Sequence, residues 1–230
     1  MKAIILAAGM GTRLKPLTDN IPKSLVKVCG EPMAERQVRF LKEKGINDII
    51  IVVGYMKEKF QYLEEKYGVK LIYNDKYDVY NNVYTMYLVR DYIKDCYITE
   101  ADVYMVENFF EWEIETSTYF IGMKENFEKE WIPKFDDEGN VNGIEVGPGS
   151  GYIMSGISYW SERDGKIIKD ELETVIKAGN FDNVYWDDVI AKIISKLQVK
   201  VQKTSLHSWF EIDSIKDLNK AETIIKTLKK

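Results

Sequence analysis

The stretch KAIILAAGMGTRLKPLT, residues 2–18, decides the fold. Its first six residues, KAIILA, form a continuous apolar run, which is typical of a strand buried on both faces of a parallel sheet. A glycine-rich polar loop follows at once. Glycines directly after a buried strand let backbone N–H groups approach an anionic ligand closely, so the stretch predicts a phosphate-binding loop. An ordinary tight turn is the alternative for the loop taken alone.

Two familiar phosphate loops are excluded by the residues that follow. The pattern GxxxxGK[ST] is absent, and Leu14 stands where the dinucleotide fingerprint GxGxxG requires its third glycine. The loop instead carries Arg13, and Lys23 comes ten residues later, directly behind Pro22. A guanidinium and an ammonium beside a glycine loop are suited to binding the phosphates of a triphosphate.

Outward from this loop, strands alternate with helices. Apolar runs predict further strands at 49–53, 70–73 and 96–99, and the first two follow predicted helices at 33–44 and 57–67. This order implies right-handed crossovers and a mostly parallel sheet. Short strands then dominate, so we expect one α/β domain over residues 1–230 with a strand-rich insertion at about 115–160.

Composition limits the class of protein. With 32 Lys and Arg against 37 Asp and Glu, the net charge is −5, which argues against a nucleic-acid or polybasic membrane surface. The two cysteines, Cys29 and Cys96, form no CxxC pair, and the single histidine, His207, makes Ser–His catalysis hard to build. Without a run of about 18 apolar residues, we expect a cytoplasmic protein with no membrane or nucleic-acid partner.

The loop also carries a family resemblance. The string GMGTRLKPLT (9–18), followed by PK (22–23), closely resembles the signature of the sugar-nucleotide and choline-phosphate nucleotidylyltransferases, and above all the bacterial CTP:phosphocholine cytidylyltransferases. Further matching stretches are PKSLV (22–26), FLKEKGINDIIIVVGY (40–55), NDKYDVYNN (74–82), EAD (100–102), EW (130–131), YWDD (185–188) and FEIDS (210–214). The resemblance implies a Rossmann-like nucleotidyltransferase fold, dependence on Mg²⁺ and release of pyrophosphate.

The resemblance also implies roles for individual residues. Lys23 and Arg13 match the cations that neutralise phosphate charge, and Asp102 and Asp213 match the metal-binding acids, with Glu211 close enough to share the metal. The positions that would contact the nucleotide are Ala7, Ala8, Gly9, Gly11, Thr12, Arg13, Asn81, Asn82 and Thr85. On the residues alone, each aspartate could instead cap a following helix.

An aromatic set indicates the acceptor. Choline cannot donate hydrogen bonds, so proteins hold it with aromatic faces and a nearby carboxylate. Trp131, Tyr185, Trp186 and Asp187 fall where the resemblance places the acceptor, although each aromatic ring alone is more often part of a core.

The resulting hypothesis is a cytidylyltransferase that condenses CTP with phosphocholine to give CDP-choline and pyrophosphate, as a monomer or homodimer. One alternative keeps the chemistry and takes 2-aminoethylphosphonate or another aminoalkyl phosphate, for which Asp187, Asp188 and Glu130 could accept hydrogen bonds from a primary ammonium. A sugar-1-phosphate acceptor and a regulatory nucleotide-binding module without turnover are the remaining alternatives.

Overall fold

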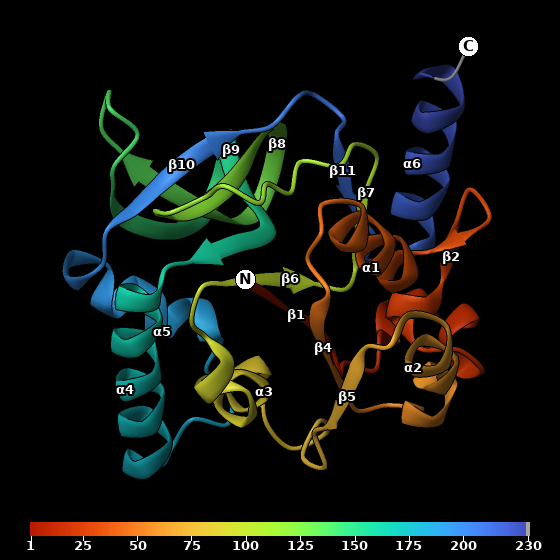
Figure 1. The fold of residues 1–230 in the computed structure, drawn as a ribbon. Coiled ribbons are helices and arrows are strands. Elements are labelled where there is room, and N and C mark those ends of the chain that lie inside the picture. The colour runs from red at the N-terminus through yellow and green to blue at the C-terminus, as the bar shows by residue number, and fades with distance from the viewer. Residues whose placement is uncertain (229–230) are drawn as a thin grey trace. The chain divides into compact units, whose positions relative to one another are not determined.

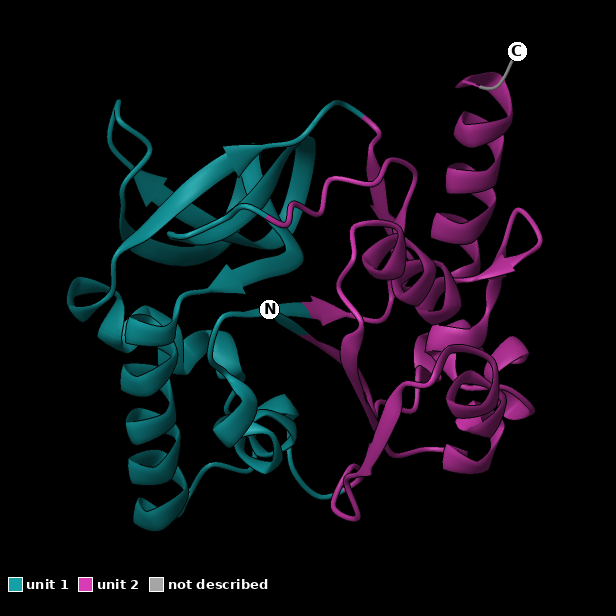
Figure 2. Ribbon diagram, in the orientation of Figure 1, with its two compact units in different colours: residues 1–2, 79–98, 113–206 teal, residues 3–78, 99–112, 207–230 magenta. Residues whose placement is uncertain are grey.

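The structure is a computed structural model, and it describes residues 1–228. The chain divides into two compact units (Figure 2). Unit 1 comprises residues 1–2, 79–98 and 113–206, and unit 2 comprises residues 3–78, 99–112 and those from 207 on. Two strands, β1 (Lys2–Ala7) and β6 (Cys96–Glu100), begin in unit 1 and end in unit 2.

Unit 2 holds the predicted strand–helix alternation. Its sheet has the order β6-β1-β4-β5, where β4 is Asp48–Val53 and runs parallel to β5, Lys70–Tyr73 (Figure 1). Two short antiparallel pairs join β2 (Lys27–Val28) to β3 (Glu31–Pro32) and β7 (Val103–Met105) to β11 (Trp209–Glu211). The helices of this unit are α1 (Met33–Glu43), α2 (Gln61–Tyr67) and α6 (Ile215–Leu228).

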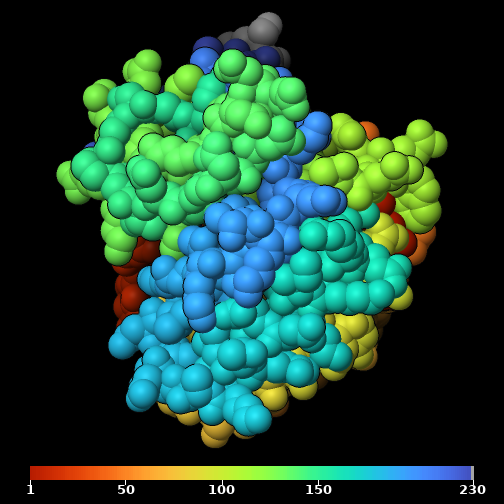
Figure 3. Space-filling model, turned by 90° about the vertical axis from the view of Figure 1, so that its left-hand side faces the viewer, coloured from red at the N-terminus to blue at the C-terminus, as the bar shows by residue number. Residues whose placement is uncertain are grey.

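Unit 1 is built on a long twisted hairpin. Its strand order is β10-β8-β9-β6, and β8 (Ser117–Phe135) is antiparallel to β9 (Val141–Trp160) and parallel to β10 (Val199–Lys203). The helices are α3 (Asn82–Leu88), α4 (Glu162–Ala178) and α5 (Trp186–Ile193). Figure 3 shows the face on which the hairpin is drawn in green and the residues of α4 and α5 in cyan to light blue.

Short 3₁₀ turns connect these elements. They are Thr12–Leu14, Leu17–Asp19, Lys23–Leu25, Lys57–Phe60, Arg90–Tyr92 and Ile194–Lys196. Three of them follow β1 in succession, so the glycine-rich stretch folds as a series of tight turns and does not lead directly into a helix.

The mostly parallel central sheet of an α/β fold is confirmed, and the strand-rich stretch differs from expectation in one respect. The short strands expected there merge into two strands of 19 and 20 residues. Register shifts between Lys124 and Phe127 and between Phe127 and Glu130 interrupt the alternation of apolar residues in β8. The sequence pattern therefore predicts two short strands where the structure has one long strand. The organisation as a single domain stays a prediction.

Burial follows from the sequence pattern. Ala3, Ile4 and Ile5 of β1 are fully buried, as the continuous apolar run predicts for a central strand. Helix α1 begins after Pro32, whose fixed φ suits a helix start, and Gly45 follows its end with a positive φ of 81°. Among residues 1–228, no helix is long and apolar enough to cross a membrane.

Candidate functional site

The loop after β1 is packed tightly against Lys23. Gly11 adopts a left-handed conformation with φ 62° and ψ 40°. A Cβ atom at this position would lie 2.5 Å from the Cβ of Lys23, so a larger residue would push the lysine away. The Gly11 carbonyl accepts the N–H of Leu14 at 3.0 Å and the hydroxyl of Thr18 at 2.9 Å. The absence of a side chain at Gly11 therefore allows the Cβ of Lys23 to pack against the loop.

Tyr55 holds both ends of this loop. Its backbone N–H donates to the carbonyl of Ala8 at 3.2 Å, and its hydroxyl donates to the carbonyl of Thr18 at 3.1 Å. A Cβ at the preceding Gly54 would lie 2.6 Å from both the Ala8 oxygen and the Cβ of Tyr77, so only glycine allows this approach. No local sequence pattern marks Tyr55, because its partners lie 47 and 37 residues away.

Lys23 lies between the two predicted aspartates. Its Nζ is 2.6 Å from Asp102 Oδ2 and 2.5 Å from Asp213 Oδ1. Arg13 Nη2 also donates to Asp213 Oδ1, at 2.8 Å. The Lys23 side chain is 14% exposed and that of Arg13 73% exposed, so the lysine is fixed in the site while the arginine extends into solvent.

Backbone pairing explains why two aspartates so distant in sequence meet. Asp102 lies in the turn between β6 and β7, and Ile212, next to Asp213, donates its N–H to the Asp102 carbonyl at 3.0 Å. Strand β11 pairs with β7 so that Glu211 faces Val103. Ile212 is itself fully buried in a cluster that also contains Leu14 from the glycine loop. One cluster therefore anchors both the loop and the second acid.

Neither aspartate caps a helix in this structure. Asp102 leads into strand β7 and not into a helix. At the start of α6, Ser214 supplies the cap, because its hydroxyl accepts the N–H of Asp217 at 3.2 Å. Both carboxylates are thus available to the site.

The carboxylates fit a divalent cation. Asp102, Glu211 and Asp213 each offer a ligand oxygen, and these oxygens all lie within 4.8 Å of one another. Asp102 Oδ1 is buried and has no hydrogen-bond partner among the described residues. A buried carboxylate oxygen without a donor costs free energy that a cation would recover, and hard oxygen ligands suit Mg²⁺.

The charge of Lys23 is stabilised by the same acids. Burial alone would lower its pKa, but the charges of Asp102 and Asp213 and their hydrogen bonds outweigh burial and raise the pKa above the ordinary lysine value. Lys23 is therefore fully protonated at neutral pH, as its predicted role in neutralising phosphate charge requires.

The predicted acceptor residues lie in unit 1, and they separate into surface and core. Trp131 on β8 and the half-exposed Tyr185 meet edge to face, with ring centroids 6.3 Å apart. Trp186 is instead 4% exposed and packs against Trp160 at 5.9 Å, with a buried Nε1 that has no partner among the described residues. Of the three predicted aromatic residues, Trp131 and Tyr185 thus contact each other, and Trp186 belongs to the core.

Asp187 is a buried acid at the first turn of α5. It is 6% exposed, and burial followed by the charge of Asp188 raises its pKa to about 7. The fully buried Tyr119 interacts electrostatically with it, and burial together with the Asp187 charge raises the tyrosine pKa. The Tyr119 hydroxyl is buried without a partner among the described residues. The sequence does not mark this residue, because only the fold brings it close to Asp187.

The residues predicted to read the base have structural contacts. Asn81 caps α3 by accepting the N–H of Asn82 at 2.8 Å. The side chain of Asn82 accepts the N–H of Trp186 at 2.8 Å, which ties the start of α3 to the start of α5. Thr85 is buried on α3. The base-reading role of these three residues stays a prediction.

Comparison with known proteins places the chain in a family. The family model described as "Nucleotidyl transferase" matches residues 2–227. The chain belongs to the nucleotidyltransferase family. This confirms the fold and the enzyme class expected from the sequence.

Relatives cover nearly the whole chain. It is 46% identical to the choline-phosphate cytidylyltransferase of Streptococcus pneumoniae, over 98% of this chain and 99% of that protein. It is 35% identical to the 2-aminoethylphosphonate cytidylyltransferase of Lancefieldella rimae, over 94% of this chain and 89% of that protein. The solved structure of the Streptococcus pneumoniae CTP:phosphocholine cytidylyltransferase matches with a TM-score of 0.96 over 97% of this chain and 98% of that one.

Proposed function

We propose that this protein transfers the cytidylyl group of CTP to phosphocholine, giving CDP-choline and pyrophosphate. The observation that carries the proposal is the Lys23 ammonium, which lies 2.6 Å from Asp102 and 2.5 Å from Asp213 against a glycine loop. The 46% identity to the Streptococcus pneumoniae choline-phosphate cytidylyltransferase supports it.

The reaction is a displacement at phosphorus. An oxygen of the phosphocholine phosphate attacks the α-phosphorus of CTP and forms a new P–O bond. The bond from the α-phosphorus to the bridging oxygen breaks, and pyrophosphate leaves with the electron pair. The attacking phosphate is already an anion, so no histidine is required as a base. The protein therefore acts by position and charge neutralisation.

The loop after β1, Lys23 and helix α3 each have a part in this step. The loop residues Ala7, Ala8, Gly9, Gly11 and Thr12 present backbone N–H groups to the triphosphate. Arg13 binds the outer phosphates, and Lys23 neutralises charge that develops during transfer. We assign the reading of the base to Asn81, Asn82 and Thr85 on α3.

The metal of the proposed reaction is Mg²⁺. Asp102 and Asp213 would hold it, with Glu211 near enough to contribute. When bound, the ion would supply positive charge that offsets the charge of the phosphates. The buried Asp102 Oδ1, which has no hydrogen-bond partner among residues 1–228, supports this assignment.

The acceptor assignment rests on Trp131, Tyr185 and Asp187, while Trp186 is buried against Trp160. Two neighbouring aromatic rings and a carboxylate suit a quaternary ammonium. A primary ammonium would need acceptor oxygens, but Asp188 already accepts the Tyr185 N–H at 2.8 Å, and Glu130 pairs with Lys124. Phosphocholine is favoured over 2-aminoethylphosphonate by the 46% identity to the choline-phosphate cytidylyltransferase, against 35% to the 2-aminoethylphosphonate enzyme.

Pyrophosphate release tests the proposal. Purified protein with CTP and Mg²⁺ would receive phosphocholine, phosphoethanolamine, 2-aminoethylphosphonate or glucose-1-phosphate in parallel, with UTP in place of CTP as a nucleotide control. We expect release with phosphocholine to exceed all others. CTP binding without release for any acceptor would instead favour a regulatory module. The cytoplasmic location, the lack of nucleic-acid and membrane partners and the monomeric or homodimeric state stay predictions.

A further inference from the structure

A fully buried glutamine encloses the turn that carries Asp102. Gln37 lies on α1 and has no exposed surface. Its Nε2 donates to the carbonyl of Glu100 at 2.8 Å and to the carbonyl of Val103 at 2.7 Å. Its Oε1 accepts the hydroxyl of Thr99, also fully buried, at 2.8 Å. One carboxamide thus contacts the chain on both sides of Asp102.

The contacts hold the backbone on both sides of Asp102. The two carbonyls belong to the residues two before and one after Asp102, so the amide spans the turn from β6 into β7. Other bonds set the remaining backbone: Ala101 donates its N–H to the Leu6 carbonyl at 3.2 Å. With the turn held on both sides, the carboxylate is directed at Lys23 before any ligand binds.

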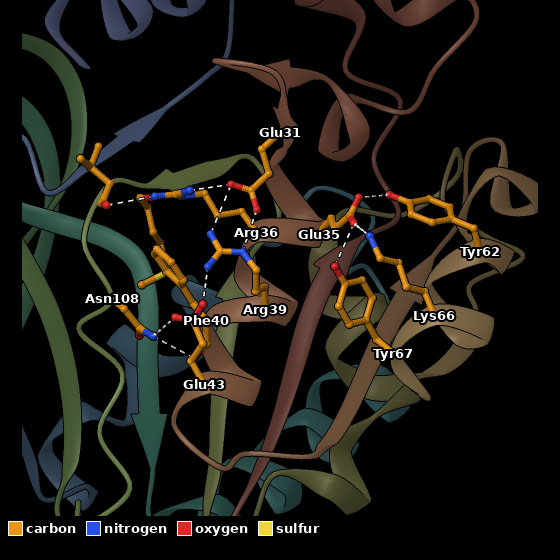
Figure 4. Close-up of polar contacts among 12 residues, drawn as sticks. Glu31, Glu35, Arg36, Arg39, Phe40, Glu43, Tyr62, Lys66, Tyr67 and Asn108 are labelled. Carbon is orange, nitrogen blue, oxygen red and sulfur yellow. Dashed lines mark hydrogen bonds and ion pairs between the residues drawn. The ribbon is translucent and has the colours of Figure 1, made fainter. Parts of the chain in front are cut away.

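Helix α1 does not depend on Gln37 for its own placement. The neighbouring Arg36 donates to the carbonyls of Met105 and Val106 and to Glu31, and its guanidinium lies over the ring of Tyr104. Figure 4 shows the bonds of Arg36 and Arg39 to Glu31. Substitution of Gln37 would therefore leave α1 attached to the segment that follows Asp102.

The amide at this position has a structural role, which the test must separate from alignment of Asp102. It satisfies two backbone carbonyls and the buried Thr99 hydroxyl, which an apolar side chain of similar volume would leave without these partners. The gain specific to the amide is direction, since its two N–H groups point to two fixed carbonyls.

We propose that Gln37 is a positioning residue that aligns Asp102 for the divalent cation and for Lys23. This inference rests on the proposed function, because it gives Asp102 the metal. It adds a residue that touches neither substrate nor metal and acts through the backbone of the turn. Outer partners of metal ligands commonly change metal affinity or activity about 10- to 100-fold when they are removed.

The test compares Gln37→Met with Val38→Ala. Methionine keeps the length of the side chain and removes all three hydrogen bonds, while Val38 is an equally buried neighbour on α1 and serves as the control for lost packing. Mn²⁺ would be titrated calorimetrically into each protein without nucleotide. We expect a Kd for Mn²⁺ raised about 10-fold or more in Gln37→Met and unchanged in Val38→Ala.

Kinetics and a second variant complete the experiment. We expect kcat to fall in Gln37→Met with KM for phosphocholine unchanged. If that variant fails to fold, Thr99→Val removes only the bond to Gln37 Oε1, and it should raise the Mn²⁺ Kd by a smaller factor. Equal Mn²⁺ affinity in the folded variant and the wild type would overturn the role of Gln37. A wild-type protein that binds no Mn²⁺ would overturn the metal assignment of the proposed function instead.

Discussion

The ammonium of Lys23 donates to Asp102 Oδ2 at 2.6 Å, and the other oxygen of that carboxylate is buried with no partner among the described residues. One oxygen of the carboxylate is thus neutralised by Lys23, while the buried Oδ1 lacks a hydrogen-bond donor among the described residues. A divalent cation would supply the missing partner. The Asp102 carboxylate therefore combines charge compensation by Lys23 with an unsatisfied oxygen that suits a metal.

Asp102→Asn should lower kcat about 10²- to 10³-fold, because a neutral amide neither binds the metal well nor balances Lys23. Steady-state pyrophosphate release measures this, and circular dichroism checks the fold. Asp19→Asn is the control: it changes an exposed aspartate that pairs with Lys15 at 3.5 Å, outside the site, and should be silent. Near-normal turnover in Asp102→Asn would refute the metal assignment.

Lys23→Met should separate metal binding from catalysis. Removal of the ammonium leaves the Asp102 and Asp213 carboxylates facing each other, so Mn²⁺ should bind as tightly as in the wild type or more tightly. At the same time kcat should fall about 100-fold, because charge on the phosphates is no longer neutralised. Calorimetry and kinetics measure the two effects, with the exposed Lys15→Met as control. Weaker Mn²⁺ binding would contradict this account.

Tyr55→Phe should raise KM for CTP about 2- to 10-fold, the effect of one lost hydrogen bond, because the hydroxyl orders the loop through the Thr18 carbonyl. KM for phosphocholine should not change. Tyr77→Phe is matched, since its ring lies 6.4 Å from that of Tyr55 and no hydrogen bond of its hydroxyl is seen in the described chain. If both variants raise KM equally, the bond to Thr18 is not the cause.

Trp131→Ala should raise KM for phosphocholine about 5- to 30-fold while KM for CTP stays constant, because a cation–aromatic contact is lost. Initial rates with each substrate varied in turn give both constants. Trp112→Ala removes an indole that is 52% exposed in the other unit and controls for a general effect of losing tryptophan. Unchanged constants in Trp131→Ala would exclude the aromatic acceptor site.

The acidity of Asp187 predicts a pH dependence. Its pKa of about 7 is raised by burial and by Asp188, so the carboxylate gains a proton as pH falls through 7. KM for phosphocholine should then rise below pH 7, since the neutral acid attracts a quaternary ammonium less. In Asp187→Asn this change should disappear, although the phosphate of the substrate titrates equally in both proteins. A parallel profile in the variant would contradict the assignment.

The same shift affects stability. Because the folded pKa exceeds the unfolded value near 4, the unfolded chain releases the Asp187 proton first as pH rises. This acid therefore stabilises the folded state at low pH, and its contribution is lost between about pH 4 and 7. Thermal unfolding of Asp187→Asn across this range should lack that decline.

Local pattern predicted the parts of the site that follow a strand directly. The apolar run that ends at Ala7 and the glycines after it predict the loop. Asp102 is predicted because it comes just after the strand that ends at Glu100. Contacts set by tertiary pairing were beyond such patterns. Gln37 contacts the turn at Asp102 although more than 60 residues separate them in sequence. From sequence alone, a single glutamine on the apolar face of a predicted helix gives no sign of these partners.

The most direct measurement offers phosphocholine and 2-aminoethylphosphonate together. Both acceptors at equal concentration would compete for limiting CTP with Mg²⁺, and ³¹P NMR would quantify the two products. The account predicts CDP-choline as the dominant product, with the preference lost in Trp131→Ala. Dominance of the cytidylylated phosphonate in the wild type would contradict the acceptor assignment, and the absence of both products would contradict the proposed reaction itself.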